Sequence, residues 1–274
     1  MATASTYEDI GTAIRAQHLA TSMEHATCVE PGMSEAEAFE LLQQENFDQA
    51  PVVSDDGLAG YVIRDDLIRE STGSVRPKIR SLRSHDLATA DSPIGETLSW
   101  LTTHPILFLL EGNDVTGFIT PSDLNKQGGR TYFYLLLAQV ELAISELLRH
   151  RYADQRQLVA DLTAARLEQV LERYEDDQKH DVATDIVSCL TFADLCEIVG
   201  RSADLREQFG FQSKKQASSR LEPVKKLRDR VMHPVRALLT DQNDITAMTE
   251  LDRLLNQLAA DAMALATAEG STSG

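Results

Sequence analysis

An internal repeat in the first half of the chain constrains the fold more than any other feature. When the sequence is shifted along itself by 57 residues, without gaps, Gly60 falls on Gly117 and Asp66 falls on Asp123. Apolar segments fall on apolar segments, although few positions are identical. A unit is commonly duplicated because two copies together bury a face that neither copy can bury alone. The repeat therefore predicts two similar units that pack against each other.

Each unit is expected to have the same order of elements. A helix begins at Ser34, where Ser34 and Glu37 form a capping box, and its counterpart begins at the Asp-Ser-Pro segment 91–93. Two strands follow, separated by Asp-Gly or Gly-Asn turn signals, and a short helix follows the second strand. The predicted strands are 50–53 and 58–63 in the first unit, and 106–110 and 115–120 in the second. The two units are thus of β-β-α type.

The pattern changes near residue 130, because almost every later segment has the helical spacing of apolar residues. The predicted helices are 131–151, 155–174, 183–199, a shorter piece from 203, 218–239 and 244–266. Short connections between such helices predict an all-α helix bundle, so the whole chain is of the α+β class. We also expect an N-terminal helical segment over 1–25, a Gly-Gly hinge over 128–130 and a flexible tail over 267–274.

Charge and cysteine content narrow the function classes. The chain has 26 Lys and Arg against 43 Asp and Glu, and this net charge of -17 excludes binding of nucleic acid or membranes through overall charge. Cys28, Cys189 and Cys196 form neither a disulfide framework nor a CxxC metal pair, which indicates a reducing cytoplasm. The first thirty residues show no signal peptide. The apolar stretch 132–148 is interrupted by polar residues and is short for a bilayer core of about 30 Å, so we expect a buried helix and no membrane partner.

The end of the second unit, Gly117-Phe118-Ile119-Thr120-Pro121-Ser122-Asp123, is the first candidate site. Gly117 permits close approach of a backbone. Thr120 offers a hydroxyl, and the Asp123 carboxylate can accept hydrogen bonds from the cis-diol of a ribose. A helix N-terminus here would favour an anion such as phosphate. The same residues are also a good capping box with proline at the first helical position, so they could merely begin a helix.

The tandem units, each ending in a Gly-apolar-apolar segment with Asp six residues after the Gly, resemble a CBS-domain pair, or Bateman module. The resemblance covers residues 26–127, with repeats over about 26–80 and 84–127. CBS domains commonly bind adenosine nucleotides. The resemblance implies that Asp123 holds the ribose and that Thr120 holds phosphate, with Gly117 in the same site.

The first repeat departs from the family pattern. It keeps Gly60 and Asp66 but has Ile63 where the motif has Ser or Thr. The resemblance therefore implies a weaker site at Asp66, which is either degenerate or uses Arg64 for phosphate.

A basic island in the helical half is the second candidate site. Residues 201–236 contain ten Lys and Arg against four Asp and Glu, within an acidic chain. A polyanion such as RNA is expected to bind there. The side chains expected to contact it are Lys225, Lys226, Arg230 and Arg236.

The same island contains candidate catalytic residues. Asp229 and His233 are four residues apart, so on a helix they share a face and the carboxylate can orient the imidazole. Arg228 and His233 are about 140° apart on an ideal helix, so either Pro234 distorts the turn or a two-fold dimer brings two chains to one groove. His233 as general base or acid at a ribose 2′-OH, with Arg228 stabilising the transition state, would suffice to cleave RNA without a metal. An ordinary surface helix with a salt-bridged histidine has the same spacing, so the pattern leaves both interpretations open.

The late Leu-Arg-Asp-Arg-Val-Met-His-Pro segment of this bundle resembles the signature of the HEPN superfamily, an Arg followed by a polar residue and, a few positions on, a His. The resemblance covers about residues 131–266. It implies that Arg228, Asp229 and His233 form the site of a metal-independent endoribonuclease that acts as a dimer, often in toxin–antitoxin or defence systems. Other HEPN proteins lack nuclease activity and serve as interaction modules.

Together, the two resemblances imply a cytoplasmic protein in which AMP, ADP or ATP bound to the CBS pair controls an RNA-cleaving homodimer. The dimer would form through the helical domain, the CBS pair or both, and an antitoxin or other protein partner is a further expectation. No cofactor is required and no metal site is predicted, because His85 and His104 have no Cys or Asp partner at metal-ligand spacing. One alternative is a non-catalytic, nucleotide-responsive module that binds RNA or protein. Another is a regulator of a separate enzyme or transporter.

Overall fold

The computed structural model describes residues 13–152, 154–158, 162–180, 185–241 and 244–272. The chain divides into two compact units. Within the described residues, one unit contains 13–129 and 239–249, and the other contains 130–238 and 250–272. We call them the mixed unit and the helical unit. The α+β class was predicted, whereas residues 239–249, expected in the helix bundle, belong to the mixed unit.

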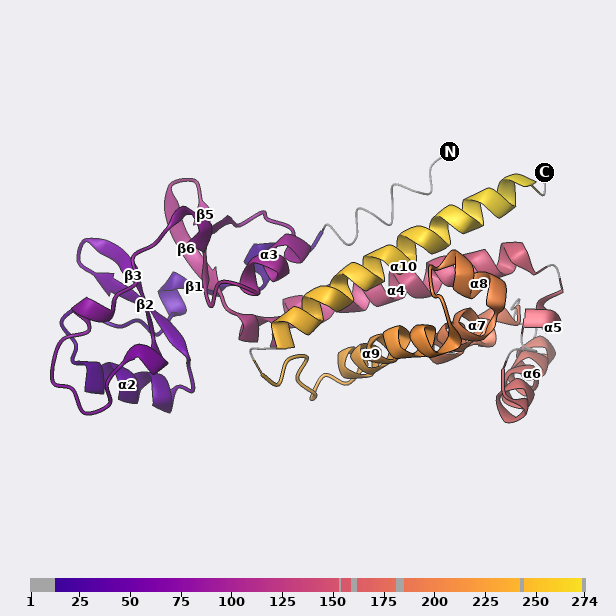
Figure 1. The fold of residues 1–274 in the computed structure, drawn as a ribbon, viewed down its shortest axis with the longest axis horizontal. Coiled ribbons are helices and arrows are strands. Elements are labelled where there is room, and N and C mark those ends of the chain that lie inside the picture. Colours follow the sequence, from indigo (N-terminus) through magenta and orange to yellow (C-terminus); the bar gives the residue numbers. More distant parts are fainter. Residues whose placement is uncertain (1–12, 153, 159–161, 181–184, 242–243, 273–274) are drawn as a thin grey trace. The chain divides into compact units, whose positions relative to one another are not determined.

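The mixed unit is built from short strands and helices (Figure 1). Its strands are β1 (Thr21–Ser22), β2 (Gln49–Ser54), β3 (Gly57–Ile63), β4 (Leu87–Thr89), β5 (Leu107–Glu111) and β6 (Asp114–Ile119). Its α-helices are α2 (Glu35–Gln44) and α3 (Ile94–Leu101). Its 3-10 helices are η1 (Ala16–His18), η2 (Met23–His25), η3 (Arg64–Asp66), η4 (Arg76–Lys78), η5 (Ser84–Asp86) and η6 (Pro121–Asn125).

The strands form two sheets that reflect the repeat. β2 and β3 make an antiparallel hairpin, and the other sheet has the order β1-β6-β5-β4, with β4 and β5 parallel. The ladder is irregular between Val52 and Val53 in the first repeat and between Leu109 and Leu110 in the second. These positions are equivalent in the repeat, so the two units share their backbone irregularity as well as their strands.

Helix α2 forms for the reasons that its sequence indicates. The Ser34 side chain accepts the Glu37 N–H at 3.2 Å, and the Glu37 carboxylate accepts the Ser34 N–H at 2.9 Å. The predicted capping box is therefore present. The helix buries Ala38 and Leu42 in a cluster with Val52 of the hairpin, and Figure 1 shows α2 lying alongside that hairpin.

The expected N-terminal helical segment has a different structure where it is described. Residues 13–25 contain η1, β1 and η2, and the remaining residues of that segment lie outside the described residues. Thr21 pairs with Phe118, so β1 extends the sheet of the second repeat. A two-residue strand carries too little periodic signal to be distinguished from a helix in the sequence.

The glycine pair expected to form a hinge lies in the first turn of helix α4 (Gln127–Arg151). A Cβ atom on Gly128 would lie 2.3 Å from the His18 carbonyl oxygen, and one on Gly129 would lie 2.3 Å from the Leu124 carbonyl oxygen. Both glycines thus permit close backbone packing within the mixed unit.

The helical unit contains most of α4 and several shorter helices. The others are α5 (Gln155–Leu158), α6 (Ala164–Lys179), α7 (Phe192–Arg201), α8 (Ala203–Gln208), α9 (Lys214–Met232) and most of α10 (Asp244–Thr272), with η8 (Val187–Cys189) before α7. The segment 155–174, predicted as one helix, is divided between α5 and α6. The described part of the predicted helix 183–199 becomes α-helical only at Phe192, the first residue of α7, which the Thr191 side chain caps. The expected flexible tail is helical as far as Thr272.

Helix α9 is displaced from its predicted range 218–239. It begins four residues earlier, where the Ser213 side chain accepts the Gln216 N–H at 3.1 Å. It ends at Met232, because His233 before Pro234 adopts an extended backbone with φ -113° and ψ 91°. A residue that precedes proline disfavours the helical conformation for steric reasons. His233 therefore belongs to the loop after the helix.

Polar pairs between α4 and α10 hold the helical unit together. The Tyr132 hydroxyl of α4 donates to the Asp252 carboxylate of α10 at 2.6 Å, and Arg151 further along α4 pairs with Glu269 further along α10. The order of these contacts means that α4 and α10 run in the same direction. Burial raises the pKa of Tyr132 and that of Asp252, the latter despite the hydroxyl that it accepts.

A second set of contacts joins α4 to the segment before α7. The Arg149 guanidinium donates to the Asp185 carboxylate at 2.6 Å, and Ser188 donates to the same carboxylate. Burial opposes ionisation of Asp185, but the hydrogen bonds from Arg149 and Ser188 prevail and lower its pKa to about 2.

Among the described residues, α4 is the one helix whose length and composition would allow it to cross a membrane. Half of its most apolar window is buried inside the protein. A core helix of a water-soluble protein and a signal sequence pass the same test of length and composition.

Candidate functional site

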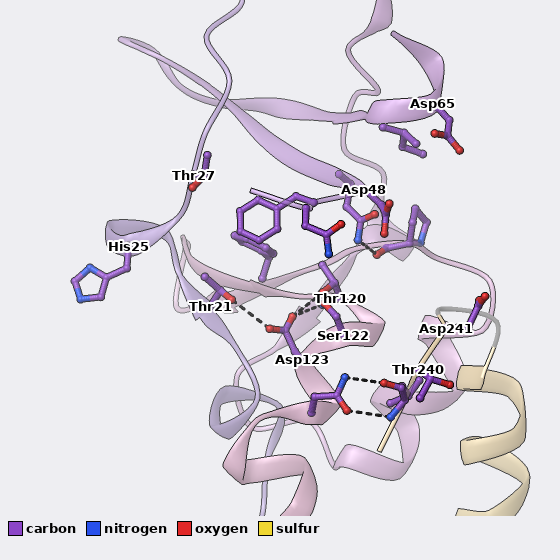
Figure 2. A pocket seen from close by; sticks show the side chains of 18 residues that line it. Thr21, His25, Thr27, Asp48, Asp65, Thr120, Ser122, Asp123, Thr240 and Asp241 are labelled. Carbon is purple, nitrogen blue, oxygen red and sulfur yellow. Dashed lines mark hydrogen bonds between the residues drawn. The ribbon is translucent and has the colours of Figure 1, made fainter. Parts of the chain in front are cut away.

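A cleft of about 760 Å³ lies in the mixed unit, within the size range of small-molecule sites. Both repeats contribute to its wall, and Figure 2 shows the side chains that line it. The titratable and hydroxyl side chains among them are Thr21, His25, Thr27, Asp48, Asp65, Thr120, Ser122, Asp123, Thr240 and Asp241. The structure thus places the predicted pair Thr120 and Asp123 in the same cleft.

Asp123 is a heavily hydrogen-bonded side chain of the cleft, and it is only 6% exposed. Its Oδ2 accepts the Thr120 N–H at 2.6 Å and the Thr120 hydroxyl at 2.9 Å. Its Oδ1 accepts the Thr21 hydroxyl at 3.3 Å and the Lys126 ammonium at 2.7 Å. A carboxylate has about four acceptor positions, so all of them are used. A ligand hydroxyl can therefore reach Asp123 only by replacing one of these donors.

The start of η6, where a helix N-terminus was expected to favour phosphate, is already capped by a side chain of the same segment. η6 is a 3-10 helix of five residues, and Asp123 itself accepts the Thr120 N–H at its start. The segment therefore forms the capping box that its sequence indicates, and the same residues also line the cleft. The Thr120 hydroxyl also contacts the Ser122 hydroxyl at 2.9 Å, so the two hydroxyls form one polar edge.

Gly117 has a structural reason to be glycine. It does not belong to the described residues that line the cleft. A Cβ atom at this position would lie 2.8 Å from the Thr21 carbonyl oxygen. The close approach that Gly117 permits is therefore to strand β1.

The corresponding residues of the first repeat are occupied by ion pairs. Asp66 accepts two hydrogen bonds from the Arg80 guanidinium, at 3.1 and 2.6 Å. Arg64, considered above as a phosphate ligand, donates to Asp48 at 2.5 Å. Asp66 is not among the described residues that line the cleft. The Asp66 position thus differs from the Asp123 position in both its partners and its surroundings.

At the second candidate site, the structure separates Asp229 from His233. The Asp229 carboxylate lies 3.7 Å from the Arg228 guanidinium, and both side chains are substantially exposed. His233 is also exposed. Because His233 has left the helix, the expected orientation of its imidazole by Asp229 does not occur: no hydrogen bond or ion pair joins these two described residues.

The loop that carries His233 is held by two arginines. Arg130 of α4 donates to the carbonyl oxygens of Arg230 at 2.5 Å, Val231 at 3.0 Å and Arg236 at 2.6 Å. The Arg230 guanidinium donates to the Leu238 carbonyl at 3.0 Å. The last carbonyl groups of a helix have no partner inside the helix, and Arg130 provides one.

The four expected RNA contacts are therefore in unlike environments. Lys225 pairs with Glu222 at 2.7 Å, and Arg230 is engaged with the Leu238 carbonyl. Lys226 and Arg236 are exposed. Burial raises the pKa of the nearby Cys196 thiol to about 12, which leaves this cysteine uncharged and unsuited to act as a nucleophile.

Sequence reasoning missed two residues at these sites. Lys126 neutralises Asp123 and also donates to the Leu19 carbonyl at 3.1 Å and to the Thr21 hydroxyl at 2.8 Å. Its spacing of three residues from Asp123 was the available signal. Arg130 reaches its three carbonyl groups across more than 90 residues of sequence, and no local pattern predicts such contacts.

Comparison with known proteins concerns the first half of the chain. The family model of the CBS domain matches residues 20–73. A hemolysin-like protein containing a CBS domain from Oenococcus oeni PSU is similar at 17% identity, with a TM-score of 0.37 over 44% of this chain and 93% of that one. The CBS domain of a bacterial CNNM/CorC family Mg2+ transporter, solved in complex with ATP, has 13% identity and a TM-score of 0.37 over 43% of this chain and 89% of that one.

CBSX2 from Arabidopsis thaliana, solved in complex with AMP, has 18% identity and a TM-score of 0.35 over 40% of this chain and 92% of that one. No curated protein matches the chain. The match of the family model to the first repeat shows that the N-terminal region of this protein contains a CBS domain.

Proposed function

We propose that the mixed unit binds an adenosine nucleotide in the cleft, with the ribose at Asp123 and the phosphate side at Thr120. The observation that carries this proposal is a nearly buried carboxylate, surrounded only by donors, on the wall of a cleft of suitable volume. The 2′- and 3′-hydroxyls of a ribose are donors of the kind that this carboxylate already accepts. They would replace the Thr21 hydroxyl and the Lys126 ammonium on Oδ1.

The charge of the cleft bears on which nucleotide it prefers. Asp48, Asp65, Asp123 and Asp241 line it, and its described lining residues include no Lys or Arg. Arg64 pairs with Asp48, and Lys126 pairs with Asp123. Each additional phosphate brings negative charge toward a wall that carries four carboxylates and no described Lys or Arg, so we expect AMP to bind more tightly than ATP when Mg²⁺ is absent.

Calorimetry tests this proposal with AMP, ADP and ATP on the full chain. Asp123→Asn keeps the size of the side chain but removes its charge, and it is expected to weaken AMP binding at least about tenfold, since hydrogen bonds to charged groups contribute roughly 1.5–3 kcal/mol. Asp66→Asn is the matched control, because Asp66 is the equivalent residue outside the cleft. Absence of binding to the wild-type chain, or equal binding by folded Asp123→Asn, would overturn the proposal.

We further propose that the helical unit acts on RNA through the end of α9, as a metal-independent endoribonuclease. Support comes from the exposure of Arg228 and His233 at one end of a basic helix, and from the loop contacts that hold His233 in place. His233 would take the proton of the 2′-hydroxyl as the 2′-oxygen attacks phosphorus. The bond between phosphorus and the 5′-oxygen would break, a water molecule would protonate that oxygen, and a 2′,3′-cyclic phosphate would remain. Arg228 would stabilise the charged phosphorane. Asp229 would then position Arg228, its partner in this structure.

A homodimer would complete such a site. Within one chain Arg228 lies on the helix and His233 lies in the loop beyond it, so a second chain would supply the opposite wall of the groove. Tyr134 and Leu142 of α4 are each 49% exposed, and their spacing of eight residues puts them on one helix face. Light scattering of the full chain measures the oligomeric state directly. A monomer at all accessible concentrations would contradict the dimeric arrangement.

Incubation of the full chain with a mixed RNA pool in EDTA distinguishes the candidate functions. Cleavage that is lost in His233→Ala and retained in His180→Ala, a control at another exposed histidine of the helical unit, supports the endoribonuclease. Binding without cleavage overturns it and supports the non-catalytic module. No binding to RNA favours regulation of a separate enzyme, transporter or antitoxin-like partner, which a stoichiometric pull-down would identify.

Regulation of the helical unit by the nucleotide is part of the same proposal. Lys126, which the ribose would displace, directly precedes α4, and Arg130 follows four residues later. A nucleotide can control the helical unit only if it binds one arrangement of α4 more tightly than another. Hydrogen exchange of residues 127–136 with and without AMP tests this link, and unchanged exchange at saturating AMP would refute it.

We expect the protein to work in the cytoplasm.

A further inference from the structure

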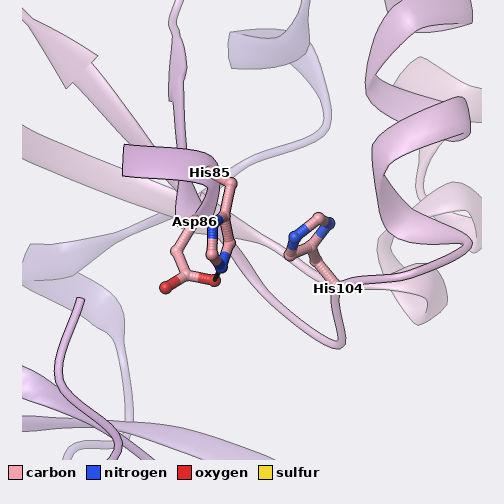
Figure 3. A group of neighbouring side chains, drawn as sticks. All are labelled: His85, Asp86 and His104. Carbon is pink, nitrogen blue, oxygen red and sulfur yellow. Dashed lines mark ion pairs between the residues drawn. The ribbon is translucent and has the colours of Figure 1, made fainter. Parts of the chain in front are cut away.

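Two histidines and an aspartate from separate segments meet at one edge of the mixed unit. His85 and Asp86 lie in η5, directly before β4, and His104 lies shortly before β5. β4 and β5 are parallel, and Leu87 pairs with Phe108. Residues that precede these strands therefore lie at the same end of the sheet. Figure 3 shows the three side chains converging from the two segments.

The three side chains are close enough to share one ion. One ligand atom of each lies within 4.8 Å of the ligand atoms of the other two. His85 Nε2 lies 3.8 Å from Asp86 Oδ1, and the two imidazole rings are 5.0 Å apart between centroids. A tetrahedral Zn²⁺ ion with bonds of about 2.0–2.2 Å holds its ligand atoms roughly 3.4 Å apart. Small side-chain rotations would therefore complete the geometry.

The Asp86 carboxylate needs a positive partner. Its side chain is only 5% exposed. Oδ2 accepts the Arg83 N–H at 2.8 Å, whereas no hydrogen bond from the described part of the chain reaches Oδ1. A buried ionised carboxylate is costly unless it is paired or coordinates a metal. Among the described residues, the imidazole of His85 is the one basic group within 4.0 Å of Oδ1, and it is a cation only when it is protonated.

The hydrogen bonds of His104 prepare it as a ligand. Its Nδ1 lies 2.9 Å from the Trp100 carbonyl oxygen. The same Nδ1 lies 3.0 Å from the Thr103 hydroxyl. In the tautomer in which Nδ1 donates to the Trp100 carbonyl, Nε2 keeps its lone pair for a metal ion. Metal-ligating histidines commonly donate their other N–H to a backbone carbonyl, which fixes the tautomer and the ring orientation.

We propose that His85, Asp86 and His104 bind a divalent transition-metal ion of the zinc type. Two imidazoles and one carboxylate suit zinc and its neighbours, whereas Mg²⁺ and Ca²⁺ prefer oxygen ligands throughout. Three protein ligands leave one position for water or for an atom of another molecule. The ion would neutralise Asp86 and join the segment between the repeats to the loop between α3 and β5. This site is separate from the residues of the nucleotide cleft and does not depend on them.

Zinc titration of the full chain by calorimetry, after treatment with a chelator and its removal, tests the site. We expect one Zn²⁺ per chain. His104→Gln and Asp86→Asn should each weaken this binding at least about tenfold. His25→Gln is the matched control in the same unit and should leave the binding unchanged. Co²⁺ bound in place of zinc should give the strong visible absorption of a tetrahedral ion, and this absorption should be lost in His104→Gln.

His104 is a partly exposed loop residue, so His104→Gln keeps the test decisive if Asp86→Asn does not fold. Absence of a one-to-one binding step in the wild-type chain would overturn the proposal. Equal zinc affinity of folded His104→Gln and of the wild-type chain would also overturn it, because the ion would then bind elsewhere.

Discussion

The contacts of Arg130 lead to a quantitative prediction about the loop that carries His233. Arg130→Gln removes a guanidinium that donates to three carbonyl oxygens at the end of α9 and in the following loop. It also removes a positive charge from a helix C-terminus, where cations are favourable. We expect this variant to loosen the loop while the rest of the helical unit stays folded.

The magnitude follows from the number and exposure of these contacts. A hydrogen bond to a charged group contributes roughly 1.5–3 kcal/mol when it is well buried. The contacts of Arg130 are partly exposed, so water can replace some of the lost donors and about 1 kcal/mol for each is the better value. The shorter glutamine can retain one of the three. The expected cost is therefore about 2 kcal/mol, which corresponds to roughly thirtyfold faster opening of the loop.

Hydrogen exchange of the backbone amides measures this opening locally, without assuming that the two units unfold together. The informative amide is that of Arg236, which donates to the His233 carbonyl at 2.9 Å. Arg228→Gln is the matched control, since Arg228 has only an exposed contact at 3.7 Å and its loss should cost under about 0.5 kcal/mol. Exchange rates that change less than threefold in Arg130→Gln, or equally in the two variants, would refute the reasoning.

Three further predictions concern stability. Gly128→Ala should destabilise the chain although alanine is the better helix former, because the new Cβ would lie 2.3 Å from a carbonyl oxygen. Gly200→Ala should instead stabilise the chain by up to about 1 kcal/mol, because the nearest atom to its Cβ is 3.7 Å away. Thermal melts that rank the two variants alike would contradict this. Tyr132→Phe should cost about 1–3 kcal/mol in urea denaturation, because a buried carboxylate of α10 loses its hydroxyl donor; a neutral effect would mean that water replaces the hydroxyl. The pKa of Asp185 in the folded state is about 2, against an ordinary value of 3.8. Its contribution to the free energy of unfolding is therefore present above about pH 4 and is lost as the pH falls toward 2. After allowance for its partial exposure, Asp185→Asn should cost about 1 kcal/mol at neutral pH and almost nothing near pH 2, and denaturation curves that differ equally at both pH values would disprove the role of Arg149.

Local signals predicted the elements of the mixed unit well. The capping box of α2 depends on residues three positions apart, and the strands depend on short apolar runs beside turn residues. Such interactions are complete within a few residues, so a sequence shows them directly. The helical unit was harder because its breaks depend on weaker signals. The end of α9 is an exception that the sequence did contain, since Pro234 restricts His233.

The interpretation of glycines shows the opposite case. Gly117 was expected to approach a ligand, and Gly128 was expected to permit bending. Both instead allow a neighbouring backbone segment to pack closely. A glycine indicates that a side chain is not accommodated, but only the fold shows which neighbour excludes it.

The sequence alone determined that the first half is a repeated β-β-α unit and that Thr120 and Asp123 lie where a strand enters a short helix. Those features depend on chain-local geometry. The tertiary structure alone decided that Lys126 donates to the Leu19 carbonyl and the Thr21 hydroxyl, that Arg130 donates to the Arg230 carbonyl, and that His104 lies beside Asp86. Such contacts depend on distance in space, and folding brings together groups that no spacing along the chain relates.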